Sequence, residues 1–409
     1  MMQRRDFLRG AAAAGCLSAA GRLTGAIEEK PKVPLDRRNE RAGMKYARLG
    51  RTNLMVSRIT HGSLHTNRQR IPLLARLYEA GVNLFDTAQN YGGGRSEQAF
   101  GEFFSQDGRR KNVFIATKID IRAHLRASKG VYQKAMERAE SSLRRLRTDY
   151  VDILMLHGCT TLIDYVNDPE WLRAVEDLKK QGKIRFVGFS EHQKPAEVLK
   201  LTAAGGRYDV AMVAFSLVKA KWGSLGRTDV KTIEPALHTA RKADMGVMVI
   251  KAAARAEQIV AKVSDPKLKK KGFSPHQLCY RYVLDLPGVV TVTCGMINLN
   301  QVKENLAVPG IELTARQREH LARMAAASGV CGFCGTCLDV CPNGVAVQDI
   351  LRLHGYYGHG HRAAARAGYA ALPSGRRATA CRGCGACEAA CPGRVAIRRG
   401  LREAHRALA

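Results

Sequence analysis

The chain has 409 residues, of which 45% are hydrophobic, so it is long enough for a large domain with a full core and a smaller accessory region. Its formal net charge of +30 is dispersed, and no basic motif interleaved with aromatic residues occurs, so we expect no nucleic-acid partner. No run reaches the roughly 20 apolar residues of a membrane-spanning helix, so we expect no membrane span.

The first residues have the pattern of an export signal. Arg4 and Arg5 precede Phe7-Leu8 and then a small apolar run, which resembles a twin-arginine signal. We therefore expect residues 1–27 to be a signal segment that directs the protein to the periplasm. The alternative is an unused basic start on a cytoplasmic protein. Residues 28–43 are charged, contain Pro31 and Pro34, and are predicted to form a linker.

Residues 44–328 alternate short apolar runs with helical patterns, which is typical of an α/β (β/α)₈ TIM barrel. Tyr46–Ser57 predicts a hairpin before the barrel, and Val131–Arg147 and Pro169–Gln181 predict helices within it. The alternative is a doubly wound sheet, but no Gly-x-Gly-x-x-Gly follows an early strand. Eight strands are predicted near Ile59–Leu64, Asn83–Asp86, Val113–Lys118, Tyr150–His157, Ile184–Ser190, Val210–Phe215, Val247–Lys251 and Val289–Cys294.

Four polar residues stand at or just past the ends of three successive predicted strands: Asp86, Tyr91, Lys118 and His157. Catalytic residues collect at this face of a (β/α)₈ barrel. A phenol with a pKa of about 10 is a poor acid at neutral pH, but a nearby ammonium held by a carboxylate lowers that pKa. A neutral histidine can orient a carbonyl oxygen. Each residue alone is more simply ordinary, but the four together indicate proton transfer to an oxygen while hydride reaches its carbon.

These residues lie in motifs that resemble the aldo-keto reductase signature, in the family's order. The motifs are Phe85-Asp86-Thr87-Ala88-x-x-Tyr91-Gly92, Ser96-Glu97, Ala116-Thr117-Lys118 and Leu156-His157, and the resemblance runs from about Met44 to Ala326. It implies a barrel that binds NAD or NADP and a small carbonyl or alcohol substrate. It also implies that Tyr91 is the general acid/base, that Lys118 and Asp86 tune it, and that His157 orients the substrate.

The same resemblance implies cofactor contacts late in the barrel. Ser190 would reach the nicotinamide amide, and the adenosine end would be held by Gly295, Gln301, Glu304 and Asn305. The alternative is that Glu304 and Asn305 simply belong to a helix. Glu191 and Met212 depart from the family, because an Asn and a Gln are common at these positions. The run 296–300 also lacks the basic residue that often holds a 2′-phosphate.

Eight of the 12 cysteines form two copies of Cys-x2-Cys-x2-Cys-x3-Cys-Pro. This is the run found in bacterial ferredoxins, in which the fourth cysteine of each run ligates the other cluster. We expect residues 329–409 to form a ferredoxin-like domain with two [4Fe–4S] clusters. One cluster would use Cys331, Cys334, Cys337 and Cys391; the other would use Cys381, Cys384, Cys387 and Cys341. Disulfides and zinc are the alternatives. The segment 349–368, with His354, His359 and His361, is predicted to add helix and loop.

The sequence thus predicts an exported iron–sulfur oxidoreductase of aldo-keto reductase type. The alternative is an iron–sulfur electron carrier whose barrel is a docking scaffold for a redox partner protein. Hydride carries two electrons and a cluster carries one, so coupling them usually needs a flavin or a similar group. No flavin site is recognisable in the sequence.

Overall fold

The computed structural model describes residues 33–127, 129–158, 162–217, 230–254, 256, 272–326, 335–358, 362–391 and 394–409. The expected signal segment, residues 1–27, lies outside the described residues. Residues Leu35–Ala409 belong to one unit. Among the described residues, no helix is long and apolar enough to cross a membrane.

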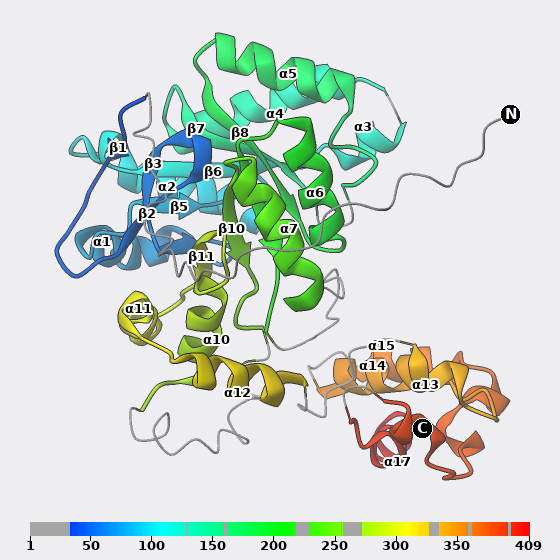
Figure 1. Cartoon of the computed structure of the whole chain (residues 1–409). Coiled ribbons are helices and arrows are strands. Elements are labelled where there is room, and N and C mark those ends of the chain that lie inside the picture. Colours follow the sequence, from blue (N-terminus) through cyan, green and yellow to red (C-terminus); the bar gives the residue numbers. More distant parts are fainter. Residues whose placement is uncertain are drawn as a thin grey trace, which may run out of the picture. The chain divides into compact units, whose positions relative to one another are not determined.

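Eight parallel strands close into a barrel, which confirms the predicted fold class (Figure 1). All eight predicted strands are present with ends displaced by at most two residues. The last strand pairs with the first, so that the sheet has no free edge. The strands are β4 (Ile59–Gly62), β5 (Leu84–Asp86), β6 (Phe114–Ile119), β7 (Val151–His157), β8 (Ile184–Glu191), β9 (Val210–Ala214), β10 (Gly246–Ile250) and β11 (Val289–Gly295).

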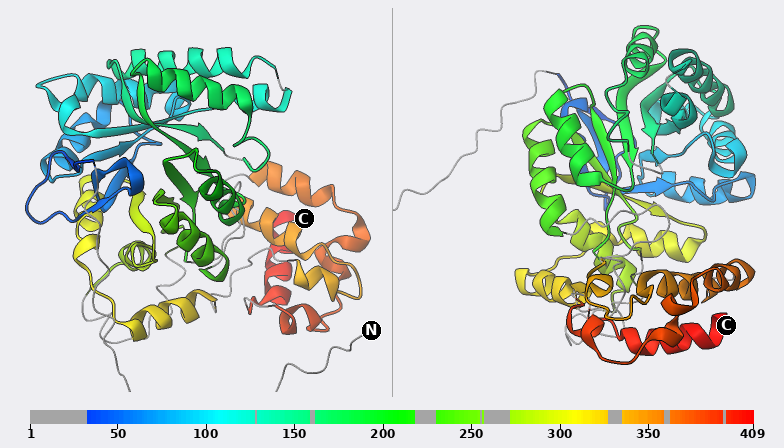
Figure 2. Two further views of the ribbon diagram at one scale, coloured as in Figure 1. Left: turned by 45° about the horizontal axis from the view of Figure 1, so that its top comes forward. Right: turned by 90° about the vertical axis from the view of Figure 1, so that its right-hand side faces the viewer.

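Helices surround the barrel, as the two views in Figure 2 show, and bury the outer face of the strands. Strands covered on both faces need apolar side chains on both, which explains their almost continuous apolar runs. Asp168 and Ser274 start α5 and α10 by accepting hydrogen bonds from backbone N–H groups of the first helical turns. The helices are α1 (Ile71–Glu79), α2 (Arg95–Phe104), α3 (Arg122–Ala127), α4 (Val131–Leu146), α5 (Pro169–Lys180), α6 (Pro195–Gly205), α7 (Val230–Lys242), α10 (Pro275–Leu284), α11 (Leu299–Leu306) and α12 (Ala315–Ala326).

A three-stranded sheet precedes the barrel. β2 (Tyr46–Arg48) and β3 (Leu54–Ser57) form the predicted hairpin, joined through the 3₁₀ helix η1 (Gly50–Thr52). β1 (Asp36–Arg37) pairs in parallel with β3, so the chain enters the folded unit before the end of the expected linker at residue 43. Apolar side chains of the hairpin, such as Leu54, join a second core cluster with residues of the barrel strands.

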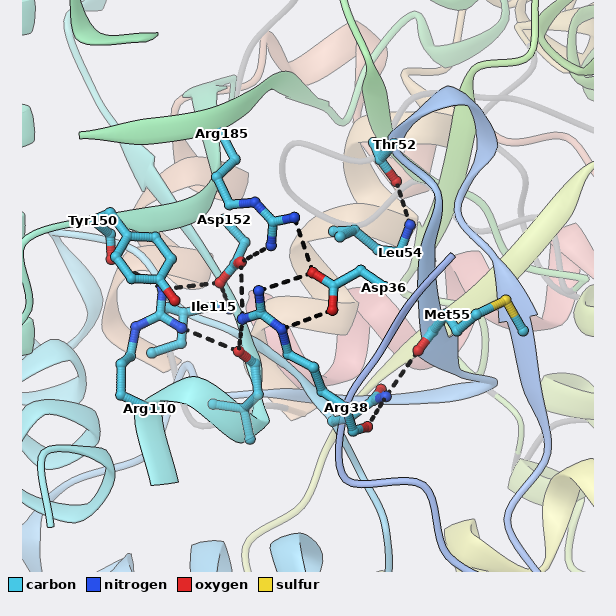
Figure 3. A network of polar contacts seen from close by, with 12 residues as sticks. Asp36, Arg38, Thr52, Leu54, Met55, Arg110, Ile115, Tyr150, Asp152 and Arg185 are labelled. Carbon is cyan, nitrogen blue, oxygen red and sulfur yellow. Dashed lines mark hydrogen bonds and ion pairs between the residues drawn. The ribbon is translucent and has the colours of Figure 1, made fainter. Parts of the chain in front are cut away.

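A buried polar network holds β1 against the barrel (Figure 3). Asp152 on β7 is 0% exposed and accepts hydrogen bonds from Arg38 (3.4 Å), Arg110 (2.9 Å) and Arg185 (2.8 Å). Asp36 accepts from Arg38 at 2.8 Å and pairs with Arg185 at 2.9 Å. Two carboxylates and three guanidinium groups, which come from four separate segments of the chain, therefore form one network.

The C-terminal region is a small helical unit with its own core. Its α14 (Val347–Gly358) packs against α15 (Arg362–Ala370) and α17 (Ile397–Leu408). Two short helices, α13 (Thr336–Asp339) and α16 (Ala386–Ala389), repeat one local arrangement. Each begins after a glycine with positive φ, 89° at Gly335 and 80° at Gly385. His354 lies on α14, whereas His359 and His361 lie outside the described residues.

Candidate active site and cluster ligands

The four residues of the predicted tetrad lie together at the carboxyl end of the barrel strands. Asp86 and His157 are the last residues of β5 and β7, and Lys118 lies on β6 between them. Tyr91 opens the short helix η3 (Tyr91–Gly94) that follows β5. Because β5, β6 and β7 are neighbours in the barrel, residues separated by up to 71 positions in the chain reach one site.

Lys118 is the centre of this site and is 1% exposed. Its ammonium donates to the Asp86 carboxylate, to the Thr87 carbonyl oxygen at 2.8 Å and to the Tyr91 side chain. The Nζ atom lies 5.1 Å from the centre of the Tyr91 ring. An ammonium has three N–H donors, and this geometry uses all three.

The charges of this group support one another. Burial lowers the pKa of Lys118, but the negative charge of Asp86 and the interaction with Tyr91 more than reverse this, so its pKa lies above the ordinary value. Burial raises the pKa of Asp86, and Lys118 offsets part of that rise. The ammonium next to Tyr91 is therefore charged at neutral pH.

His157 also lies next to Tyr91. The two ring centres are 5.9 Å apart in an edge-on arrangement with an angle of 76° between the ring planes. Burial, followed by the charge of Lys118, lowers the pKa of His157 to about 3. The imidazole is therefore neutral over the physiological range and can orient an oxygen by hydrogen bonding without carrying charge.

The loop that carries Tyr91 is held by residues whose role the sequence did not reveal. Ser96 Oγ lies 2.8 Å from Thr87 Oγ1 and 2.6 Å from Ser63 Oγ. Gly94 has a φ of 90°, and a Cβ there would stand 2.9 Å from Arg145 Cδ. The positive φ favours glycine at this position, and any side chain would also have to displace the end of the Arg145 side chain.

Glu97 ties the same loop to the barrel and to α4. It is 0% exposed, accepts from Thr117 Oγ1 at 2.6 Å and pairs with Arg145 at 2.7 Å. Thr117 is the neighbour of Lys118 on β6. The sequence signal was the Ser96-Glu97 pair, which was recognised as a motif but given no role.

One predicted cofactor residue has the property that a ligand site needs. Ser190 lies beside His157 in the register of β7 and β8, is 0% exposed, and its Oγ has no hydrogen-bond partner among the described residues. A buried hydroxyl without a partner costs free energy unless a ligand satisfies it. Gly295 ends β11, where a Cβ would meet nothing within 4 Å. The barrel end therefore presents a buried hydroxyl that a ligand could satisfy.

The two departures from the family have structural explanations. Glu191 accepts hydrogen bonds from the backbone N–H groups of Leu162 (2.7 Å) and Gln193 (2.6 Å), so its carboxylate organises the surrounding loops. Burial raises the pKa of Glu191 despite these bonds. Met212 is 0% exposed and packs in the core cluster inside the barrel. Neither side chain replaces the polar contact of the residue common in the family.

The three residues predicted on α11 already have roles within the fold. Gln301 accepts from the Ile297 N–H at 2.9 Å, and Glu304 accepts from the Ser274 hydroxyl. Asn305 is 4% exposed. The preceding loop exposes Ile297 (46%) where a basic residue often stands in the family.

Four of the predicted cluster ligands meet at one pocket. Cys341 lines it together with Cys381, Cys384 and Cys387, which is the crossed set expected for one cluster. Within the described parts of the chain the cysteines form no disulfide, and no group of three or more His, Cys, Asp or Glu side chains is arranged around a single ion. Of the other set, Cys337 is buried and Cys391 is half-buried, while Cys331 and Cys334 lie outside the described residues.

Comparisons with known proteins cover both parts of the chain. Residues 60–252 and 191–326 match the Aldo/keto reductase family, and residues 323–392 match a 4Fe-4S dicluster domain. The chain is 36% identical over 155 residues to the uncharacterized oxidoreductase YqkF of Bacillus subtilis. This match covers 36% of this chain and 49% of that protein. It is 26% identical over 281 residues to the norsolorinic acid reductase stcV of Emericella nidulans, covering 61% of this chain and 70% of that protein.

Solved structures with similar folds cover the barrel. The holo form of the aldo-keto reductase AKR11C1 from Bacillus halodurans has a TM-score of 0.54 and 27% identity, over 69% of this chain and 96% of that chain. An aldo-keto reductase from Klebsiella pneumoniae in complex with NADPH has a TM-score of 0.54 and 23% identity, over 69% of this chain and 95% of that chain. The second likeness concerns the fold alone.

Proposed function

The chain belongs to the Aldo/keto reductase family and carries a 4Fe-4S dicluster domain, and on this premise we propose that it transfers hydride between a nicotinamide and a small carbonyl or alcohol. The observation that carries the proposal is the buried Lys118 ammonium, shared between Asp86, the Thr87 carbonyl and Tyr91. An ammonium next to a phenol favours the phenolate, so this arrangement supports proton transfer by Tyr91.

In the proposed reaction each residue has one task. Tyr91 donates its hydroxyl proton to the substrate oxygen, and the Lys118 ammonium stabilises the phenolate that remains. Asp86 keeps Lys118 charged and in place, and neutral His157 orients the oxygen. A bound nicotinamide supplies the hydride. Ser190 would hold its amide, and Gly295, Gln301, Glu304 and Asn305 would contact its adenosine end.

The test compares Tyr91→Phe with Tyr132→Phe, which removes a phenol from the outer helix α4, where it bonds Asp177 at 3.0 Å. NADPH oxidation is measured with a panel of aldehydes and ketones, and NADPH binding by fluorescence. Tyr91→Phe should lower turnover by several orders of magnitude and leave binding largely intact, because only the proton donor is lost. Equal turnover in both variants would contradict the assignment.

We also propose two [4Fe–4S] clusters with crossed ligation, which supply one-electron transfer. The support is the pocket that brings Cys341 to Cys381, Cys384 and Cys387. Anaerobically prepared protein should hold about eight iron and eight sulfide per chain. Cys341→Ser and Cys391→Ser should damage different clusters, which their electron paramagnetic resonance signals would distinguish. Stoichiometric zinc without sulfide would contradict the proposal.

A second candidate function is electron transfer alone, with the barrel as a docking surface for a redox partner. Met212 and Glu191 favour it, because neither gives the nicotinamide contact common in the family. Binding of NADPH to the purified protein separates the two functions. Saturable binding that Ser190→Ala weakens supports the reductase, whereas no binding supports the electron carrier.

We further propose export to the periplasm through the twin-arginine route, on the basis of Arg4-Arg5 and the apolar run that follows. The alternative is a cytoplasmic reductase. Fractionation of cells that express the full chain and its Arg4→Lys/Arg5→Lys variant decides between them. Wild-type protein in the cytoplasmic fraction would contradict export.

A further inference from the structure

A hollow lined by arginines lies among helices outside the strands of the barrel, and none of its lining residues belongs to the tetrad. It has a volume of about 740 Å³ and is lined by residues of the 3₁₀ helix η2 (Arg68–Arg70), α2 and α4 and by residues next to these helices. The helix α2 packs against both η2 and α4. Five arginines face it against one glutamate: Arg68, Arg95, Arg144, Arg145 and Arg147, with Glu102. These residues come from three separate segments, so the charge is gathered by the fold rather than by one basic run.

The arginines of the hollow differ in what already binds them. Arg68 pairs with Glu102 at 2.6 Å, and Arg145 pairs with buried Glu97 at 2.7 Å. The side chains of Arg95, Arg144 and Arg147 are exposed and make no hydrogen bond or ion pair within the described residues. Of the three, Arg144 interacts with the nearby carboxylate of Glu140 through charge alone. None of the three guanidinium groups is hydrogen-bonded to a carboxylate within the described residues, so each can donate to an acidic oxygen in bidentate fashion.

Neutral polar groups complete the lining. Gln69, Gln98 and Ser141 contribute further hydrogen-bonding side chains, and Asn67 Oδ1 is buried without a partner among the described residues. The described lining contains no aromatic side chain on which a nucleic-acid base could stack. A concave site rich in arginine and amide groups suits a small anion with several acidic oxygens better than a base or an apolar ligand.

We propose that this arginine hollow binds a small multivalent oxyanion, one that presents two or more phosphate or carboxylate groups at once. The Arg95 and Arg144 side chains clamp it from opposite helices, α2 and α4. The proposal does not rest on hydride transfer, because none of the lining residues belongs to the tetrad or to the predicted cofactor contacts.

The test titrates the full-length, anaerobically prepared protein with sodium pyrophosphate and, separately, with citrate, in a calorimeter at constant ionic strength. These two probes distinguish a phosphate from a carboxylate preference. The wild type should bind at least one of them saturably below about 1 mM, equivalent to about −4.1 kcal/mol. No saturable binding of either anion would overturn the proposal.

Matched variants separate the hollow from general charge. Arg95→Gln/Arg144→Gln removes two charges from it, and Arg241→Gln/Arg316→Gln removes two exposed charges from α7 and α12. The first pair should weaken binding at least tenfold and the second less than twofold. Gln98→Glu, which adds a carboxylate to the lining, should also weaken binding while keeping the melting temperature. Equal weakening by both double variants would overturn the proposal, because the effect would then be one of net charge alone.

Discussion

Replacing Asp152 with asparagine tests whether the buried network of Figure 3 stabilises the barrel. Asparagine keeps the shape of the side chain but removes the charge that Arg38, Arg110 and Arg185 share. Its amide nitrogen would also face guanidinium donors. Removing one partner from a buried charge cluster costs about 3–5 kcal/mol, because the opposite charges remain without compensation.

The expected loss of unfolding free energy for Asp152→Asn is therefore about 3–5 kcal/mol. A larger loss is not expected, because Asp36 still pairs with Arg38 and Arg185 in the variant. For a domain of this size the loss corresponds to a melting temperature lower by roughly 6–20 °C. Urea unfolding followed by tryptophan fluorescence reports on the barrel, because Trp171 is buried there and both tryptophans precede the cysteine-rich region.

Asp244→Asn is the matched control. Asp244 pairs with Arg48 at 2.6 Å, but the two side chains are 48% and 38% exposed. Solvent screens such a pair, so the loss should stay below about 1 kcal/mol. If Asp152→Asn cost no more than this control, the idea of a buried, mutually dependent charge cluster would be refuted. NADPH binding at temperatures where the variant is folded should not change.

Three further predictions concern other parts of the chain. Burial lowers the pKa of His61 and His157 to about 3 and of His192 to about 4, so between these values and about pH 6.5 the unfolded chain binds more protons than the folded chain. The stability that these histidines contribute is complete above about pH 6.5, and at pH 5 it is lower by roughly 1–2 kcal/mol per histidine. Urea titrations at pH 7 and pH 5 measure this loss. Gly94→Ala should cost more than about 1 kcal/mol in unfolding experiments and reduce turnover, whereas Gly182→Ala, at a positive φ without a close contact, should leave turnover intact. Arg398→Gln, which removes a positive charge from the pocket of Cys341 and Cys387, should make the reduction potential of one cluster more negative in a redox titration. The control Arg399→Gln, which changes an exposed arginine, should leave that potential unchanged. An equal shift in both variants would contradict a local effect.

The barrel strands could be predicted because each one is recognisable from residues that are neighbours in the sequence. Each strand is a short apolar run bounded by polar or glycine residues, and such a run remains visible without any partner. The tetrad could be predicted for the same reason, since Asp86 and His157 each end such a run. Their placement at strand ends, rather than residue type alone, predicted that these side chains lie together, and the structure brings them together.

The missed features depend on distant partners. β1 has only two residues, Asp36 and Arg37, and no periodicity can reveal a strand that short. Its place is set by pairing with β3 and by contacts such as Arg38 to Asp152, 114 positions away. Likewise, the sequence showed that Glu191 is unusual but not that it accepts hydrogen bonds from the loops around it.

In the proposed reaction the four residues depend on one another, because burial alone would neutralise the charged groups. Removing water lowers the pKa of Lys118, and a neutral amine would not stabilise a phenolate. Asp86 reverses that effect, but burial raises its own pKa, so each member of the pair depends on the charge of the other. The Thr87 carbonyl takes a further N–H of the ammonium and fixes its direction towards Tyr91. Asp86→Asn should therefore impair turnover through the protonation of Lys118, even though Asp86 need not touch the substrate.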